Sequence, residues 1–291
     1  MKCSLCETEG DFEVITNQLR YGESKSAVKC PGCGLVFLDP PMTKEEEEKF
    51  YREEYGETYS KEKDTSPEEL FELRIPEAEE YFKLVGEFVE ADDDVLELGC
   101  ASGYFLHYLR DKVKSVTGFE PFTEFQEYCR KMDIPLLDDL ENVPDNSYDK
   151  VYMFFLVEHL TEPYAYMKNV ARILRDGGKI LFIVPNVDDV LVSQYKVEGF
   201  HGFYYTLAHP FYYSKETLSK MLTKCGFDDF EVRAHQRYDL SNHMNWMMTG
   251  KPGGQGRFND IFPEELKDVY AKTLIDQFIC DTLFGVVTIH K

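Results

Sequence analysis

Four cysteines near the amino terminus have the spacing of a metal site. Two C-x2-C pairs, 23 residues apart, contribute the thiols of Cys3, Cys6, Cys30 and Cys33. Each pair can place two thiolates about 2.3 Å from one ion, and two pairs complete a tetrahedral site. We expect structural zinc here, with a redox pair and an iron site as the alternatives. Because sulfur would take all four positions, none remains open for a catalytic metal.

A strand, a glycine turn and a helix in the middle of the chain form a second pattern with chemical meaning. The apolar residues at 95–98 predict a buried strand, residues 99–103 a turn, and residues 104–110 the start of a helix. In doubly wound α/β folds, this unit binds a nucleotide.

The turn suits a sulfonium cofactor better than a pyrophosphate. The dinucleotide fingerprint G-x-G-x-x-G ends in a glycine, and here that position is Tyr104. Glu97, two residues before Gly99, would repel phosphates but suits the ammonium group of S-adenosylmethionine (SAM). Glu120 follows the next strand and can accept hydrogen bonds from both hydroxyls of a ribose. We therefore expect SAM as the cofactor.

The order of these motifs resembles that of class I SAM-dependent methyltransferases. E-L-G-C-A-S-G at 97–103 and F-E-P at 119–121 look like motif I and the acidic site after it. The similarity continues through the segments at 136–163, 171–186 and 209–227. Apolar spacing predicts a helix at 76–90 and residues 214–225 predict another, which Gly226 stops. Residues 230–238 and 283–291 predict two closing strands. The cysteine pairs with CPGCGLVFLDPP resemble a subgroup in which a zinc ribbon precedes the methyltransferase domain.

The resemblance implies a cofactor site residue by residue. The methionine end of SAM is expected against Glu97, Gly99, Cys100, Ala101 and Gly103. The ribose is expected on Glu120, and the adenine beside Pro121 or Phe122, with its amino group at Asp139 and Leu140. The sulfonium is expected above Phe154 and Phe155. Cys100 stands where many members have another small residue, and we expect no catalytic role for it.

The resemblance also implies a fold class and a domain organisation. We expect an α/β, Rossmann-like, doubly wound seven-stranded sheet with a small zinc ribbon. The predicted parts are the ribbon at 1–40, a helical connector at 41–75 and the methyltransferase domain at 76–291. Two insertions on the substrate side are expected at 186–213 and 239–262. The first covers the substrate or packs as an aromatic core, and the second, with Trp246, forms part of the acceptor pocket.

Three residues are candidates for handling the proton of an acceptor hydroxyl, which is a poor nucleophile at neutral pH. His209 is expected to be the base, His159 to orient the acceptor, and Glu158 to tune His159. His201 is a weaker candidate from the same segment. For both His159 and His209 the alternative is a purely structural role.

The charge balance bears on the acceptor. The net charge is −22, and no basic stripe is present to bind a phosphate backbone. We therefore expect a small-molecule acceptor and no nucleic acid. The sequence has neither a membrane-spanning apolar run nor the apolar stretch of a signal peptide, which predicts a cytoplasmic protein without a membrane partner.

Several alternatives remain open from the sequence. The zinc-ribbon subgroup resembles enzymes that O-methylate sugars or other small metabolites in surface-polysaccharide or natural-product biosynthesis, and C- or N-methylation is the alternative. A SAM-binding interaction protein without turnover is a second hypothesis. An NAD-dependent oxidoreductase is a third, which the missing third glycine disfavours. The sequence fixes neither the acceptor nor the oligomeric state.

Overall fold

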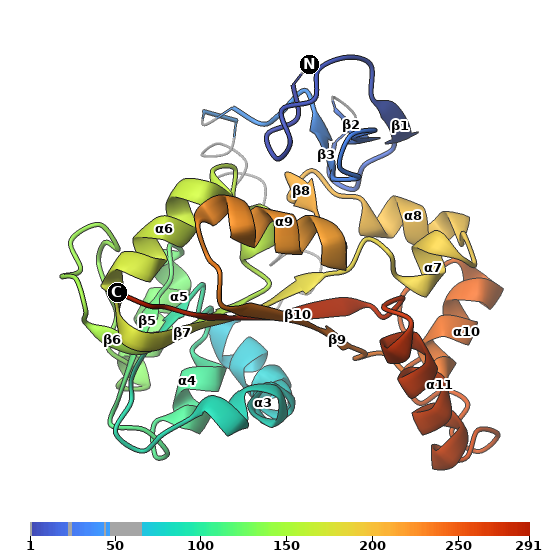
Figure 1. Cartoon of the computed structure of the whole chain (residues 1–291). Coiled ribbons are helices and arrows are strands. Elements are labelled where there is room, and N and C mark those ends of the chain that lie inside the picture. Colours follow the sequence, from blue (N-terminus) through green and yellow to red (C-terminus); the bar gives the residue numbers. More distant parts are fainter. Residues whose placement is uncertain (1, 23–24, 44, 47–65) are drawn as a thin grey trace. The chain divides into compact units, whose positions relative to one another are not determined.

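The computed structural model describes residues 2–22, 25–43, 45–46 and 66–291 as an α/β protein (Figure 1). Most of the connector expected at 41–75 lies outside the described residues. The chain divides into two units. The sheet unit comprises Glu45–Leu156, Glu162–Phe182 and Val286–Lys291. The cysteine unit comprises Met1–Lys44, Val157–Thr161 and Ile183–Gly285.

The helices and strands alternate along the middle of the chain, as in a doubly wound fold. The elements that begin in the sheet unit are α3 (Pro67–Val85), η2 (Gly86–Phe88), β4 (Asp94–Leu98), α4 (Tyr104–Leu109), β5 (Ser115–Phe119), α5 (Thr123–Lys131), β6 (Tyr148–Phe154), α6 (Pro163–Ile173) and β7 (Leu174–Pro185). In that unit α3 and α4 lie on one face of the sheet and α6 on the other (Figure 1).

The cysteine unit collects elements from three parts of the chain. They are β1 (Glu13–Thr16), β2 (Ser26–Lys29), β3 (Val36–Asp39), η3 (Val157–His159), α7 (Val190–Ser193), α8 (Glu198–Tyr204), β8 (Phe211–Tyr212), α9 (Lys215–Cys225), β9 (Phe230–His235), α10 (Leu240–Thr249), α11 (Glu264–Asp276) and the start of β10 (Thr282–Thr288).

The central sheet is mostly parallel, with strand order β5-β4-β6-β7-β10-β9. β4 pairs in parallel with β5 and β6. β10 is antiparallel to β7, since Gly177 N donates to Ile289 O at one end and Asn186 N donates to Asp281 O at the other.

The expected count of seven strands is wrong for the described residues, where this sheet has six. Leu136 forms a single parallel bridge with Gly118 of β5 where a seventh strand was expected. The pairing stops there because Pro135 has no N–H to donate, and Asp138 and Asp139 are residue types that strands disfavour.

Helix α3 begins earlier than the sequence suggested. Ser66 caps it: Ser66 Oγ accepts from Glu69 N at 3.2 Å, while the Glu69 side chain accepts from Ser66 N at 2.8 Å. Pro67 occupies the first turn, where a missing N–H costs nothing. The helix then continues through Pro76, so residue 76, the expected start of the main domain, lies inside an element.

Other local predictions are confirmed. The buried strand β4 leads through the glycine turn into α4, as expected. The helix expected at 214–225 is α9, which Ser214 caps and which Gly226 ends in the left-handed conformation (φ +93°). The two closing strands are β9 and β10. Within the described residues, no helix has both the length and the apolar character needed to cross a membrane.

The insertion expected at 186–213 places several of its aromatic side chains in a buried core. It forms α7, α8 and β8, and it buries side chains against the amino-terminal strands within the cysteine unit. Trp246, expected near the acceptor pocket, also belongs to this core. Its ring lies 5.0 Å from that of Phe200 and 5.2 Å from that of Phe203. The indole is 3% exposed, so it offers no surface to an acceptor.

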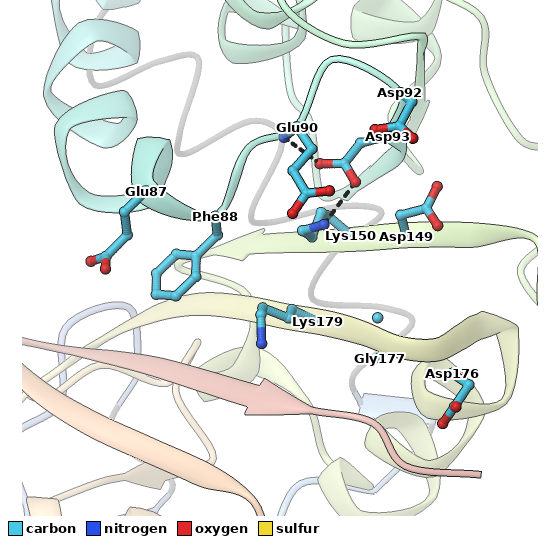
Figure 2. Close-up of a pocket in the computed structure, with 11 residues that line it drawn as sticks. Glu87, Phe88, Glu90, Asp92, Asp93, Asp149, Lys150, Asp176, Gly177 and Lys179 are labelled. Carbon is cyan, nitrogen blue, oxygen red and sulfur yellow. Dashed lines mark hydrogen bonds and ion pairs between the residues drawn. The ribbon is translucent and has the colours of Figure 1, made fainter.

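A hollow of about 290 Å³ lies at the amino ends of β4, β6 and β7 (Figure 2). Ligands of doubly wound sheets bind at the opposite, carboxyl ends. The hollow contains a buried ion pair, in which Lys150 Nζ lies 2.7 Å from Asp93 Oδ1. Asp93 Oδ2 also accepts from Glu90 N at 2.8 Å. We assign this hollow to the stability of the sheet.

Lys150→Met should lower the free energy of unfolding by about 3–5 kcal/mol, because it leaves the Asp93 carboxylate buried without its cation. Denaturant unfolding followed by circular dichroism measures this change. Adding Asp93→Asn should recover most of the loss. The matched control is Lys114→Met, which removes a far more exposed partner of Asp94 and should cost at most about 1 kcal/mol. Equal losses in the two single variants would contradict the assignment.

Candidate cofactor site, cysteine cluster and histidine cluster

The turn after β4 has a backbone that favours glycine. Gly99 and Gly103 both have φ of +75°, in the left-handed region. A Cβ on Gly103 would lie 2.5 Å from Cδ1 of Ile134, so no side chain fits there. Ala101, between the two glycines, is also left-handed, with φ of +46°. The left-handed backbone therefore explains why glycine stands at both ends of this turn.

Glu97 is a buried carboxylate at the end of β4. Its Oε2 has no hydrogen-bond partner among the described residues. Burial raises the pKa of this carboxyl well above its usual range, and the nearby Cys129 and Glu120 raise it further. A buried polar atom without a partner requires an explanation, and a bound ammonium group supplies one. The chain therefore has a group that fits the amino-acid end of SAM.

Glu120 joins the turns that follow β4 and β5. Its Oε2 accepts from Ala101 N at 2.9 Å, and its Oε1 accepts from Phe122 N at 3.0 Å. Burial raises the pKa of Glu120 to about 7, although both hydrogen bonds oppose this shift. A carboxylate has about four acceptor sites, so capacity remains for two ribose hydroxyls.

Cys100 directs its side chain away from any ligand at the turn. The thiol is buried, and a Cβ added to Gly118 of β5 would lie 2.6 Å from Cys100 Sγ. The side chain therefore packs on β5, and only the backbone of Cys100 is available to a cofactor. This agrees with the expectation that Cys100 is a small apolar residue without a catalytic role.

The residues expected at the adenine differ in exposure. Pro121 is exposed and Phe122 is half-buried. Asp139 is exposed and accepts from Glu141 N at 2.9 Å and from Asn142 Nδ2 at 3.1 Å. Leu140 is buried. Asp139 thus has local hydrogen bonds that fix its orientation, and its role toward adenine stays a prediction.

The residues expected at the sulfonium end the fourth strand. Phe154 is buried, and its ring lies 4.5 Å from the ring of Tyr81. Phe155 has φ of +55°, which is unusual for a bulky residue and costs on the order of 1–3 kcal/mol. Such strain is typical of functional sites, so it supports the expected place of Phe155 without testing it.

Two polar residues of this region were not anticipated from the sequence. Ser102 is fully buried inside the glycine turn, and its Oγ has no hydrogen-bond partner among the described residues. The hydroxyl of Tyr152 in β6 is also buried without a hydrogen-bond partner among the described residues. A serine between two turn glycines could have been noticed. Nothing in the sequence distinguished Tyr152, because an aromatic residue is ordinary in a buried strand.

The four amino-terminal cysteines converge as predicted. The sulfurs of Cys3, Cys6, Cys30 and Cys33 all lie within 4.8 Å of one another. Sγ of Cys3 and Sγ of Cys33 are 3.7 Å apart, and those of Cys6 and Cys30 are 3.5 Å apart. An ion with tetrahedral bonds of about 2.3 Å separates its sulfur ligands by about 3.8 Å. The cluster therefore fits zinc, in a module with the strands of a zinc ribbon.

Helix α9 supports the cysteine cluster within the same unit. Lys224 Nζ donates to Ser4 O at 2.5 Å and to Leu5 O at 3.1 Å. Lys220 Nζ donates to Cys33 O at 3.4 Å. These two cations reach the carbonyls of both cysteine turns, where they can offset the negative charge of four thiolates around one zinc ion.

The three candidate catalytic residues also come together in the cysteine unit. One ligand atom from each of Glu158, His159 and His209 lies within 4.8 Å of the other two. The imidazole rings meet edge to face, with centroids 4.6 Å apart. His201 does not join them: its Nε2 lies 3.3 Å from Val192 O.

Burial controls the protonation of this cluster. It raises the pKa of Glu158 to about 8 and lowers that of His159 to about 4. The pKa of His209 falls well below its usual range, because of burial and then of repulsion from His159 and Arg20. Near neutral pH both imidazoles are therefore uncharged.

Comparison with known proteins assigns the fold. A model of the methyltransferase domain family matches residues 70–232. The chain belongs to this family. A SAM-dependent methyltransferase from Archaeoglobus fulgidus superimposes with a TM-score of 0.53 at 16% identity, over 81% of this chain and 100% of that one. This likeness shows the class I α/β methyltransferase fold.

Curated relatives match in part. A tRNA U34 carboxymethyltransferase of Aliarcobacter butzleri is 25% identical over 187 residues, 58% of this chain and 59% of that protein. A Mycolicibacterium smegmatis protein named "Probable S-adenosylmethionine-dependent methyltransferase" is 31% identical over 102 residues, 33% of this chain and 39% of that protein. This methyltransferase-family chain thus spans less than two thirds of either relative.

Cys30→Ser should remove one equivalent of zinc per chain, because three thiolates and a hydroxyl hold the ion more weakly than four thiolates. Elemental analysis of protein purified without added metal measures the difference from wild type. Cys280→Ser, a buried thiol outside the cluster, is the control and should keep the wild-type content. Equal zinc in the two variants would show that the cluster does not hold it.

Glu120→Ala should weaken SAM binding by about 1.5–3 kcal/mol, the usual worth of hydrogen bonds to a charged group. Titration calorimetry measures this. Because the pKa of Glu120 is about 7, its carboxyl ionises as the pH rises from 6 to 8 and then accepts more strongly. Wild-type affinity should therefore rise over that interval, and the rise should shrink in Glu120→Gln. Unchanged affinity in Glu120→Ala, matching the exposed control Glu124→Gln, would place the ribose elsewhere.

Proposed function

We propose that the chain transfers a methyl group from SAM to a hydroxyl group of a sugar or another small metabolite, as in surface-polysaccharide or natural-product biosynthesis. The observation that carries the proposal is the unpartnered buried carboxylate of Glu97, at the end of β4 in a domain of the methyltransferase family. A carboxylate at this place suits the cationic amino-acid end of SAM and not a pyrophosphate.

The sheet unit supplies the cofactor-binding residues in this proposal. Glu97 binds the ammonium group, the glycine turn admits the methionine backbone, and Glu120 accepts from the ribose hydroxyls. When bound, SAM supplies a sulfonium whose methyl carbon is taken up by the acceptor oxygen, while the electron pair of the broken carbon–sulfur bond stays on sulfur. The main task of the protein is to align the acceptor with that methyl group.

His159 and His209 are the residues that handle the acceptor in this proposal. The hydroxyl must lose its proton as the oxygen–carbon bond forms. Both imidazoles of the cluster are uncharged near neutral pH, so either can face an O–H donor. His159 is anchored through Nδ1, which lies 2.9 Å from Ala208 O, whereas the His209 ring has no hydrogen bond of this kind within the part of the chain that the structure describes. This difference supports His209 as the group nearest the leaving proton and His159 as the residue that orients the acceptor.

A small acceptor is favoured over RNA by charge. Relatives named tRNA U34 carboxymethyltransferase match part of this chain, which makes RNA the alternative acceptor. A net charge of −22 opposes binding to a phosphate backbone, because such binding depends on lysine and arginine. We therefore propose a small molecule and treat tRNA as an arm of the test.

His209→Ala should lower the turnover number by roughly 10²–10⁴, the usual contribution of a proton-handling residue, with SAM affinity nearly unchanged. The assay measures methyl transfer from labelled SAM to sugar nucleotides, small hydroxyl or acid metabolites, and tRNA. Transfer to tRNA alone would overturn the small-molecule proposal. SAM binding without methyl transfer to any of these acceptors would indicate a binding protein. Normal turnover in His209→Ala would exclude His209 from the proton step.

A further inference from the structure

Two imidazoles and one carboxylate converge in the cysteine unit, apart from the four cysteines. We propose that Glu158, His159 and His209 bind a divalent first-row transition metal ion, such as Zn²⁺, Fe²⁺ or Mn²⁺. The role of this ion, to hold the acceptor oxygen, rests on the proposed function. The existence of the site does not, because it stands on the geometry of the three side chains.

The carboxylate of Glu158 is the first observation behind the site. The residue is 2% exposed, and neither Oε1 nor Oε2 has a hydrogen-bond partner among the described residues. A buried carboxyl that lacks any hydrogen bond is costly to the folded state. A cation bound between Glu158 and the histidines supplies the missing partner.

His159 is the second observation, because its tautomer is determined. Nδ1 lies 2.9 Å from Ala208 O, and a carbonyl oxygen only accepts, so Nδ1 carries the proton. The lone pair of the ring is then on Nε2. Histidines that bind metals use this arrangement: one ring nitrogen donates to a carbonyl, which fixes the ring, while the other binds the ion.

The loop that holds His209 is fixed before any ligand binds. Tyr212 Oη accepts from Thr206 N and donates to Thr206 O, both at 2.8 Å. Thr206 Oγ1 accepts from Ala208 N at 3.2 Å. His209 N in turn donates to Thr206 O at 3.2 Å. A ligand on such a preorganised loop loses little freedom when the metal binds.

Neighbouring charges allow a cation at this place. Arg237 acts on Glu158 electrostatically, but its Nε lies 3.3 Å from Asp281 Oδ1, and that carboxylate offsets its charge. Arg20, which acts on His209, stacks on the ring of Phe203 at 4.5 Å. The carboxylate of Glu158 is therefore the main charge that acts on a metal ion at this cluster.

The donor set selects the kind of ion. Imidazole nitrogen suits zinc, iron, copper and nickel, whereas magnesium and calcium prefer oxygen ligands. Two histidines and one carboxylate on one side of an ion leave open positions, as in catalytic zinc and non-haem iron sites. Ligands on a common ion lie roughly 3–3.5 Å apart, so atoms that lie within 4.8 Å of one another need to close by at most about 1.5 Å.

An open position has a use in the proposed reaction. An oxygen acceptor that binds a divalent ion loses its proton at lower pH, because the ion stabilises the negative charge. The O–H bond breaks, the electron pair stays on oxygen, and the proton passes to water. In this form His209 binds the ion instead of taking the proton itself, so its loss also lowers turnover.

Cobalt(II) titration of the full chain, purified with the cysteine site filled by zinc, tests the site. Cobalt bound by nitrogen and oxygen gives visible ligand-field bands without the sulfur-to-metal charge transfer of a cysteine site. One such ion per chain is expected. Glu158→Gln and His209→Gln should each weaken its binding by at least about 100-fold, since losing even an outer-shell partner costs 10–100-fold. His201→Gln, from the same segment, is the matched control and should bind as wild type.

Thermal unfolding and SAM binding confirm that each variant is folded, and Glu158→Asp serves as a second carboxylate variant with intermediate affinity. No cobalt bound outside the cysteine site, or equal binding by His209→Gln and His201→Gln, overturns the metal site. Full methyl transfer by wild type that lacks this ion overturns its role in the reaction and leaves the proposed function standing. Bound cobalt without methyl transfer to any acceptor supports the site and overturns the function.

Discussion

The carboxylate of Glu120 is the constraint on which the ligand edge of the sheet unit depends. It accepts from Ala101 N in the turn after β4 and from Phe122 N in the turn after β5. These amides lie outside the strand ladders, so a single side chain satisfies both. Burial opposes the charge of that carboxylate and raises its pKa to about 7. The two turns are thus held together by one carboxylate whose burial is costly.

Glu97 in the sheet unit and Glu158 in the cysteine unit are also buried carboxyls that are costly to the folded state. Each is a buried carboxyl with at least one oxygen that lacks a partner among the described residues. Stability alone would favour apolar side chains at such positions. In a family that binds SAM, the cost of Glu97 has a direct reason in a cationic ligand. Glu158 follows β6 on the chain, and the imidazoles beside it give its cost a comparable reason.

The cysteine cluster and the histidine loop are mechanically linked within one unit. Cys33 leads directly into β3, which pairs with β8 through Val36–Tyr212 and Phe37–Phe211. β8 follows His209 after a single residue, and Leu38 N donates to the carbonyl of that residue, Pro210, at 3.0 Å. The ribbon that carries the four cysteines therefore also determines where His209 lies. The amino-terminal module thus contributes to the positioning of a candidate functional residue.

The sequence by itself determined the features that depend on neighbouring residues. The cysteine spacing, the strand–glycine–helix unit, the capped helix α9 and the closing strands follow from local geometry, and the family follows from the order of these motifs. Tertiary structure decided the rest. Pro76 lies inside α3 because packing overrides propensity, and Trp246 is buried by partners 43 and 46 residues away in the chain. The convergence of Glu158 and His159 with His209, about 50 residues on, was not visible in any local pattern, because long-range packing sets it.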